Sequence, residues 1–159
     1  LTRLRPGYTS GWPLISSWIL IQARMSSWSL NALRATTRVA GPAASLELRA
    51  PDRLRLGLIY EARFTISARR ELKDAVLVLD SDWVEGQTMN TIEPSPVSEG
   101  SRDGDLVFKL GHVPAGRRFV LFLQLQVNPT TVGRRKQDVV LYDGSKRIAS
   151  IHRTVVIFP

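Results

Sequence analysis

Few side chains of this sequence could carry out catalysis. His112 and His152 are its only histidines, and it contains no cysteine. Without cysteine there is no thiolate nucleophile, no thiolate zinc site and no disulfide framework. Neither histidine stands in a zinc-binding motif such as His-Glu-x-x-His, so we interpret both as histidines of surface strands or turns. These residues predict a protein that is not an enzyme and that holds no metal or cofactor.

Carboxylates gather at two points, Asp80-Ser81-Asp82 and Asp103-Gly104-Asp105. Loop carboxylates can bind calcium, but calcium needs many oxygen ligands, and neither stretch matches an EF-hand loop. Polar residues that tolerate turn conformations explain both stretches equally well. We therefore favour two turns over two calcium sites.

Two short basic clusters, Arg117-Arg118 and Arg134-Arg135-Lys136, stand where loops are expected. Arginine suits phosphate, but charged residues in solvated turns are the commoner explanation. Nucleic-acid binding also calls for exposed aromatic residues on which bases stack. After residue 45 most aromatic residues are expected to point inward, with Phe122 as the exception. Nucleic acid and small-molecule substrates are thus not the partners that the sequence favours.

Positive charge is concentrated in the first 45 residues. The sequence has a formal net charge of +8, and between Leu1 and Ser45 the only charged side chains are arginines. The first acidic residue is Glu47. A basic segment before a nearly balanced one points to an anionic surface, either lipid headgroups or nucleic acid. The arginines that we expect to contact this surface are Arg3, Arg5, Arg24 and Arg34.

An apolar stripe that includes tryptophan runs through the same segment. A helix that begins near Pro13, where proline is tolerated, would place five apolar residues on one face and Ser16 and Ser27 on the opposite face. Tryptophan favours the headgroup region of a membrane. The residues that we expect to dock on a membrane or a partner are Trp12, Leu14, Trp18, Ile21, Met25 and Trp28.

Several interpretations of this N-terminal arm, residues 1–40, stay open. A helix lying among the headgroups needs an apolar face, basic residues and tryptophan, all of which are present. A full span needs about 20 apolar residues, and here Ser17, Gln22 and Arg24 interrupt the run. The arm could also pack on protein, or be a targeting segment that is cleaved. We favour association with a membrane.

After Gly41-Pro42, a pair that breaks regular structure, the sequence alternates between apolar and polar residues. Seven or eight such segments with turns between them predict an all-β, immunoglobulin-like β-sandwich over residues 41–159. The turn around Gly144 reads as a hairpin. The expected strands cover residues 45–50, 60–68, 75–79, 88–92 (an edge strand), 106–110, 119–127, 139–142 and 148–158.

Two segments have a familiar pattern: SLELRAPDRLRLGLIYEARFTISARRELKDAVLVLD and LVFKLGHVPAGRRFVLFLQLQVNP. Over roughly residues 45–129 the chain resembles bacterial surface modules with DUF11-type or CARDB-like immunoglobulin folds. It departs from them at Arg69-Arg70-Glu71, where those modules usually have Asn-Thr-Gly. The resemblance implies an exported, non-enzymatic domain used for spacing, adhesion or assembly.

We therefore expect a membrane-associated accessory module of the bacterial cell envelope whose sandwich contacts another protein. Its expected partners are membrane lipid, an integral membrane protein, or both. If the arm spans the membrane, Arg3 and Arg5 keep its beginning in the cytoplasm and place the sandwich outside. Two alternatives are a structural subunit of a larger complex, with the arm packed on protein, and a nucleic-acid-binding protein that uses the basic clusters.

Overall fold

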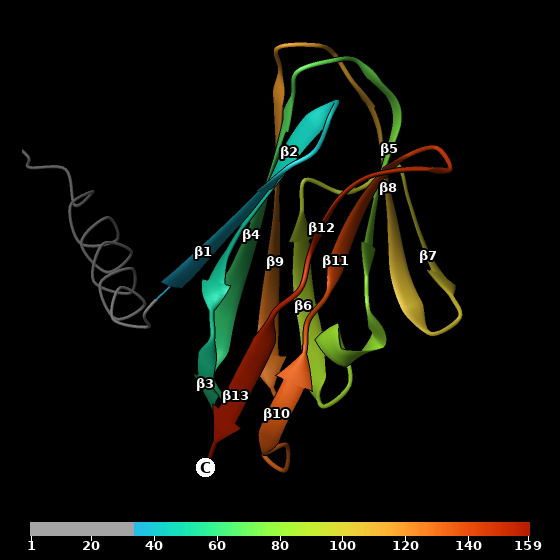
Figure 1. Ribbon diagram of the computed structural model, residues 1–159. Coiled ribbons are helices and arrows are strands. Elements are labelled where there is room, and N and C mark those ends of the chain that lie inside the picture. The colour runs from blue at the N-terminus through green and yellow to red at the C-terminus, as the bar shows by residue number, and fades with distance from the viewer. Residues whose placement is uncertain (1–33) are drawn as a thin grey trace, which may run out of the picture. The chain divides into compact units, whose positions relative to one another are not determined.

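The computed structural model describes residues 34–159, which form an all-β structure (Figure 1). This range contains thirteen strands and one turn of 3-10 helix, η2. The elements are β1 (Arg34–Ala40), β2 (Ala44–Pro51), β3 (Arg53–Arg55), β4 (Ile59–Ala68), β5 (Leu72–Leu79), η2 (Ser81–Trp83), β6 (Gln87–Glu93), β7 (Ser98–Arg102), β8 (Asp105–Val113), β9 (Arg118–Val127), β10 (Gly133–Lys136), β11 (Val139–Asp143), β12 (Lys146–Ile151) and β13 (Thr154–Phe158).

Two five-stranded antiparallel sheets form a sandwich. The β4 sheet has the order β1-β2-β4-β9-β6, and the β5 sheet has the order β12-β11-β5-β8-β7. A short third sheet, β10-β13-β3, lies at one end (Figure 1). On one side of the sandwich β12 contacts β1 and β2, so the two large sheets meet there. On the other side β6 and β7 are the last strands of their sheets.

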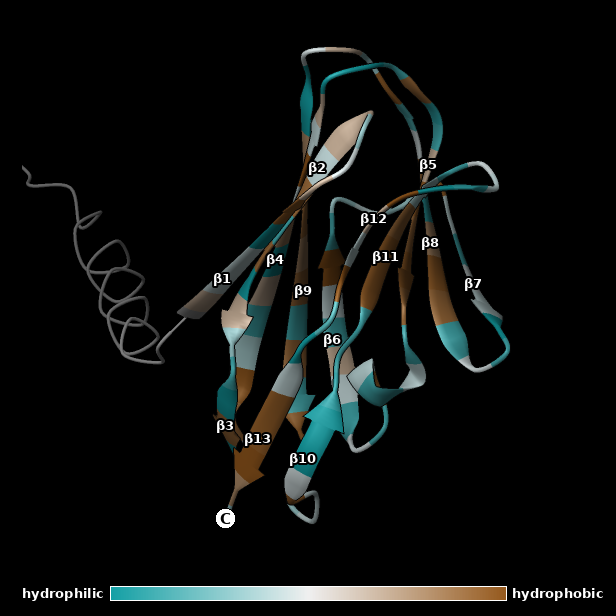
Figure 2. Cartoon of the chain, viewed as in Figure 1, coloured by the Kyte–Doolittle hydropathy of each residue, from teal (hydrophilic) through white to brown (hydrophobic). Residues whose placement is uncertain are grey.

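Alternation of apolar and polar residues decides which sheet faces meet. In β4, Ala62 and Phe64 are fully buried, whereas Glu61, which points to the opposite face of the sheet, is exposed. Successive residues of a strand point to opposite faces, so each large sheet offers one apolar face to the other. The same contrast separates whole strands: Figure 2 shows an apolar β13 beside a hydrophilic β10. The core lies between the two sheets and extends to the third.

Several strands agree closely with the sequence pattern. The strand expected over residues 60–68 is β4, and the one expected over residues 119–127 is β9. The edge strand expected over residues 88–92 is β6, which ends its sheet. The β11–β12 hairpin is also confirmed, with Gly144 at a φ of 58° in its turn.

The sandwich begins earlier than the sequence indicated. We assigned residues 34–40 to the N-terminal arm, but they form β1 and pair with β2 along their whole length. Gly41 belongs to the turn between these strands, where its N–H donates to the carbonyl oxygen of Ala44 at 2.9 Å. The alternation in β1 is weak because Val39 is its only large apolar residue. A strand with so few apolar side chains resembles a polar linker in sequence.

The expected number of seven or eight strands was too low. The short strands β3, β7 and β10 lie in segments for which the sequence pattern predicts no strand. The run expected over residues 148–158 is two strands, because the chain leaves the β5 sheet at His152 and Arg153 and continues in the third sheet. All five residues of β7 are exposed, so no burial pattern marks this strand in the sequence.

Candidate functional site

Most of the residues that we expected to meet a membrane or partner precede the part of the chain that the structure describes. Arg34 is the first residue of β1. Across residues 34–159, no helix has the length and apolar character needed to cross a membrane. The expected docking and anion-contact residues outside the described range are Trp12, Leu14, Trp18, Ile21, Met25, Trp28, Arg3, Arg5 and Arg24.

An apolar floor lies on the outer face of the β5 sheet. It consists of Val76 and Val78 of β5, Val107 of β8 and Tyr142 of β11. The register places Tyr142 opposite Val76 and Val107 opposite Val78, so the four side chains are neighbours. The outer face of a two-layer antiparallel sandwich is normally polar. This floor therefore needs an explanation other than packing within the core.

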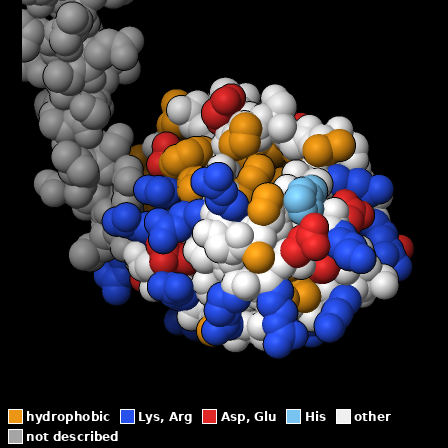
Figure 3. All heavy atoms as spheres, turned by 90° about the horizontal axis from the view of Figure 1, so that it is seen from above, with side chains coloured by type: hydrophobic (Ala, Val, Ile, Leu, Met, Phe, Trp, Pro, Cys, Tyr) orange, Lys and Arg blue, Asp and Glu red, His pale blue; other side chains and the backbone are white. Residues whose placement is uncertain are grey.

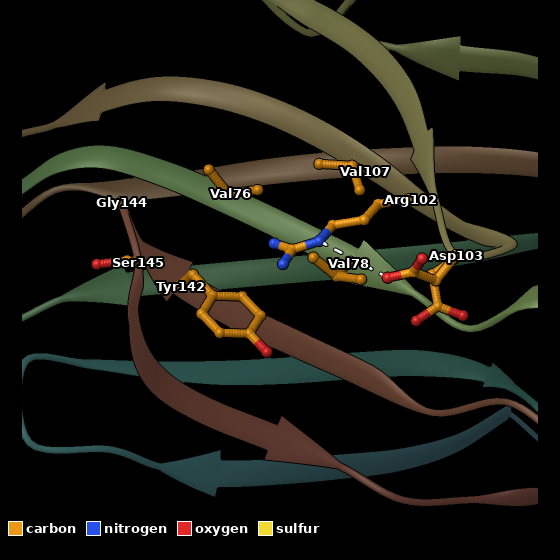
Figure 4. A pocket seen from close by; sticks show the side chains of 9 residues that line it. Val76, Val78, Arg102, Asp103, Val107, Tyr142, Gly144 and Ser145 are labelled. Carbon is orange, nitrogen blue, oxygen red and sulfur yellow. Dashed lines mark ion pairs between the residues drawn. The ribbon is translucent and has the colours of Figure 1, made fainter.

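The floor is the base of a groove of about 500 Å³. The β7–β8 turn, with Asp103 and Gly104 both at positive φ, bounds one part of it, and the β11–β12 turn bounds another. Figure 4 shows the side chain of Arg102 reaching over the floor toward Val78, with the ring of Tyr142 nearby. A cation therefore stands over an apolar surface.

Arg102 is only weakly engaged. Its Nε lies 3.9 Å from Oδ2 of Asp103, and the two side chains are 85% and 93% exposed. Exposed ion pairs of this length contribute little to stability. The guanidinium can thus turn to an incoming carboxylate without losing a strong partner.

Strand β7 adds an open edge beside the groove. It is the last strand of its sheet, and no other strand among residues 34–159 pairs with its outer side. Gly100 stands at its centre, opposite Val107, and a Cβ added there would meet no atom within 4 Å. Val97, just before the strand, is 75% exposed. An unpaired edge offers backbone N–H and C=O groups to another extended chain.

The carboxylates after β5 hold turns together. Oδ2 of Asp80 accepts the N–H of Asp138 at 2.9 Å, and Oδ2 of Asp82 accepts the N–H of Lys136 at 3.1 Å. Burial raises the pKa of Asp80 to about 6, with the nearby charge of Asp138 adding to the shift while the Asp138 N–H opposes it. Within the described range no three acidic or histidine side chains are arranged to hold a metal. These residues act as turn residues, as the sequence indicated.

The two histidines lie on the surface and apart from each other in the fold. Nε2 of His112, on β8, lies 2.8 Å from Oε1 of Glu71. Nδ1 of His152, between β12 and β13, lies 2.8 Å from Oδ2 of Asp138. Both histidine side chains are more than half exposed. The expectation of surface histidines in strands or turns is confirmed.

A buried polar group, Tyr60, serves the fold. Its hydroxyl donates to Oε1 of Gln87 and accepts a hydrogen bond of 3.3 Å from Nε2 of Gln137. Burial raises the pKa of Tyr60 to about 12, so the phenol stays protonated at neutral pH. These bonds connect β4 to β6 and to the segment between β10 and β11, and they give the buried hydroxyl of Tyr60 both an acceptor and a donor.

Part of the signal for the groove is visible in the sequence. Residues 75–79, which we expect to form a strand, are apolar without alternation, and such a run is typical of a strand covered on both faces; Val76 is only 8% exposed. Nothing in the sequence showed that Val107 and Tyr142 would join Val76 and Val78, because that neighbourhood depends on the order of strands β11, β5 and β8. The open edge at β7 was missed because all five residues of that strand are exposed and leave no burial pattern.

No known protein family matches the sequence, and no curated protein matches it. The structure is similar to a CARDB domain from Pyrococcus furiosus solved with di-metal ions, at 11% identity over 77% of this chain and 95% of that one, with a TM-score of 0.45. It is similar to the chitin-binding domain of a Pyrococcus furiosus chitinase, at 14% identity over 72% and 100%, with a TM-score of 0.44. It is also similar to the human F-spondin reeler domain, at 16% identity over 79% and 95%, with a TM-score of 0.47. A CARDB domain, the kind of module that residues 45–129 resemble, is thus among the structures similar to this chain.

Proposed function

We propose that this chain is a non-catalytic interaction module with an immunoglobulin-like sandwich, which binds an extended segment of a partner protein and is held at a membrane by its N-terminal arm. The observation that supports the proposal most is the apolar floor on an outward sheet face beside the open edge of β7. Backbone hydrogen bonds along such an edge supply affinity, and pockets for alternate side chains supply specificity.

The geometry suits a segment that adds one strand next to β7. Gly100 leaves no side chain between that added strand and Val107. Neighbouring strands lie about 4.8 Å apart, so a large apolar side chain of the partner can cross Gly100 and reach the floor. Val78 is the next floor residue along this row. The groove would then select phenylalanine, tyrosine or leucine at one position.

Charge favours an acidic partner segment. Residues 34–159 contain 19 of the 22 basic residues and all 14 acidic ones, which leaves a net charge of +5. Arg102 stands over the groove with only a weak partner. Opposite charge speeds the encounter of two proteins and favours the correct register. The proposed occupant is therefore an extended acidic segment that carries a large apolar residue.

The titratable residues support a role without catalysis. His112 and His152 each face one carboxylate on the surface. Asp80 and Asp82 accept backbone N–H groups that close turns. The His152–Asp138 pair lines a separate open hollow of about 360 Å³, and acid–base catalysis there would need a substrate held within hydrogen-bond reach of the pair. The groove instead offers valine and tyrosine side chains as its floor.

Selection of displayed random peptides on the full-length chain tests the groove. We expect enriched peptides to combine an acidic residue with a large apolar one. Replacing Val78 with glutamate should weaken their binding at least tenfold, because the new charge lies on the apolar floor and repels the acidic peptide, and about 1.4 kcal/mol suffices for that factor. Fluorescence anisotropy of a labelled peptide measures the dissociation constants.

A matched control comes from the other sheet. Val120 of β9 is also a half-buried valine, but it lies outside the groove. Val120→Glu introduces the same change and should leave peptide affinity within about twofold. Equal losses for Val78→Glu and Val120→Glu would show that the peptides bind elsewhere, and no enrichment at all would also count against the groove.

Membrane attachment is the part of the proposal that rests on the arm alone. The motivating pattern is an acid-free, tryptophan-bearing segment with one apolar face. In flotation with vesicles of phosphatidylglycerol and phosphatidylcholine, Trp18→Glu combined with Ile21→Glu should lower the bound fraction of the full-length chain at least fivefold. Ser16→Glu with Ser27→Glu adds the same charge to the opposite face and should have a smaller effect. Identical flotation of both double variants would contradict attachment through that face.

The side of the membrane on which the sandwich works follows from the same proposal. Arg3 and Arg5 precede the apolar segment, and positive charge is retained on the cytoplasmic side. A spanning arm would therefore hold the sandwich outside the cytoplasm, where the partner segment would meet it.

A further inference from the structure

A second hollow, of about 190 Å³, lies near the end of the sandwich that carries the β4–β5 and β8–β9 turns. Its lining comes from β1, β2, β4, both turns and the start of β9. The side chains that can bind a ligand there are four arginines and two serines: Arg38, Arg69, Arg117, Arg118, Ser45 and Ser67.

Strand register explains why there is space between these arginines. Ser45 of β2 is paired with Ser67 of β4, and Ser67 is paired with Arg118 of β9. The three residues form one row across the sheet, and Arg38 of β1 lies in the next row. The side chains of Ser45 and Ser67 are too short to fill the surface between Arg38 and Arg118. A hollow with hydroxyl groups in its floor is the result.

The turns hold the other two arginines in place through the backbone. The N–H of Arg69 donates to the carbonyl oxygen of Ala43 at 2.8 Å. The N–H of Ala68 donates to the carbonyl oxygen of Arg117 at 2.9 Å, and the N–H of Gly116 donates to that of Ala68 at 2.8 Å. The two turns are thus tied together. Arg69 and Arg117 start from fixed backbone positions, which reduces the entropy lost when they bind a ligand.

The positive charge of this hollow is not neutralised within residues 34–159. All four arginines are exposed, and none forms an ion pair with a described residue. Residues 1–33 contain no acidic side chain that could do so. Glu47 is paired with Arg38 in register, so one carboxylate stands in the neighbouring row. Figure 3, which looks onto this end of the sandwich, shows lysine and arginine side chains gathered along its rim.

The arginines do have uncharged partners that leave donors free. Arg38 donates to Oγ of Ser45 at 3.3 Å, and Arg69 donates to the carbonyl oxygen of Gly41. A guanidinium has five N–H donors, so each of these arginines keeps donors for a ligand. Several like charges around one hollow create a potential that attracts an anion.

We propose that this arginine hollow binds a phosphate group. Guanidinium groups bind phosphate oxygens through paired, charge-assisted hydrogen bonds, and the serine hydroxyls of the floor add further donors. The phosphate can belong to the headgroup of an anionic phospholipid or to free inorganic phosphate, which present the same oxygens. The site lies apart from the β7 groove and does not depend on a peptide partner.

A titration of the full-length chain with inorganic phosphate, followed by NMR of arginine side chains, tests the chemistry. Replacing Arg117 and Arg118 together with glutamine should weaken phosphate binding at least tenfold. Arg134→Gln with Lys136→Gln removes two exposed positive charges from β10 and serves as the matched control, with a change of less than about threefold expected. Equal weakening by both pairs, or no shift of Arg117 and Arg118 resonances, would overturn the proposal.

Flotation with vesicles distinguishes the two sources. If the phosphate is a lipid headgroup, R117Q/R118Q lowers binding to phosphatidylglycerol vesicles more than R134Q/K136Q does, and added inorganic phosphate competes. If the source is free phosphate, the two double variants float alike while the phosphate titration still separates them. Either result supports the phosphate site. The absence of any difference in both measurements refutes it, whatever the peptide groove does.

Discussion

Replacing Trp83 with alanine should lower the free energy of unfolding by about 3–5 kcal/mol. Trp83 is fully buried, and its ring centroid lies 5.5 Å from that of Phe64 in the facing sheet. Its Nε1–H donates to the carbonyl oxygen of Asp138 at 3.1 Å, and the guanidinium of Arg153 lies 6.0 Å from its ring. Alanine would leave a large cavity and would remove the hydrogen bond as well.

Urea denaturation of the full-length chain measures this effect as a change in midpoint at constant m-value. Trp83→Phe keeps much of the volume but loses the donor, so it should cost about 1–2 kcal/mol. Val97→Ala, at a side chain that is 75% exposed, should change stability by less than about 0.5 kcal/mol. A loss below about 1 kcal/mol for Trp83→Ala would mean that this ring is not a central part of the core.

The second large effect is expected at Gly41, where alanine should cost about 1–3 kcal/mol and valine more. A Cβ at this position would lie 2.1 Å from the carbonyl oxygen of Ile148 and 3.0 Å from that of Ala44. Both contacts are with backbone, so strands must shift to relieve them. The steric clash lies where the β1–β2 turn packs on β12 and the two large sheets meet.

Gly100→Ala is the matched control, because an added Cβ on β7 meets nothing and the backbone there is not at positive φ. Alanine at Gly100 should be neutral or slightly stabilising. Thermal or urea unfolding of both variants gives the comparison. If Gly41→Ala were as neutral as Gly100→Ala, residues 41–42 would behave as the break between arm and sandwich that the sequence pattern suggested, and β1 would not be an integral strand.

The regular strands could be predicted from the sequence because burial imposes alternation on them. Phe64 of β4 and Leu123 of β9 each stand in a run with a period of two and are fully buried. Such a pattern fixes both the strand and its inward face. The same alternation predicted that Phe122, unlike the residues on either side of it, points away from the core. In the structure the ring of Phe122 is half-buried, and the guanidinium of Arg63 lies 5.4 Å from its centroid.

Two of the edge strands, β1 and β7, escaped prediction because little of their surface is buried. Residues 34–40 and 98–102 form β1 and β7, and each stands at the end of its sheet. Their backbone pairing with β2 and β8 holds them in place, and backbone hydrogen bonds leave no pattern in side-chain type. The arm boundary was placed too late for this reason.

Both candidate sites also depend on strand neighbourhoods that the sequence does not contain. The groove floor needs β11, β5 and β8 side by side, so that Tyr142 and Val107 flank the valines of β5. The arginine hollow needs β1, β2, β4 and β9 in order. Arg117-Arg118 was recognisable as a basic pair, but Arg38 and Arg69 joined it only through the fold.

Hydrogen–deuterium exchange of the full-length chain, with and without a selected peptide, tests most directly whether the open edge and the groove bind as one surface. In β7, residues 98–102, only the amides that point away from β8 are free to pair with a partner strand. Strand addition predicts that these amides exchange at least tenfold more slowly when the peptide is bound, because they then donate to its backbone. Amides of β6, the edge of the other sheet, should exchange at unchanged rates. Protection of β6 with no change in β7 would contradict the account.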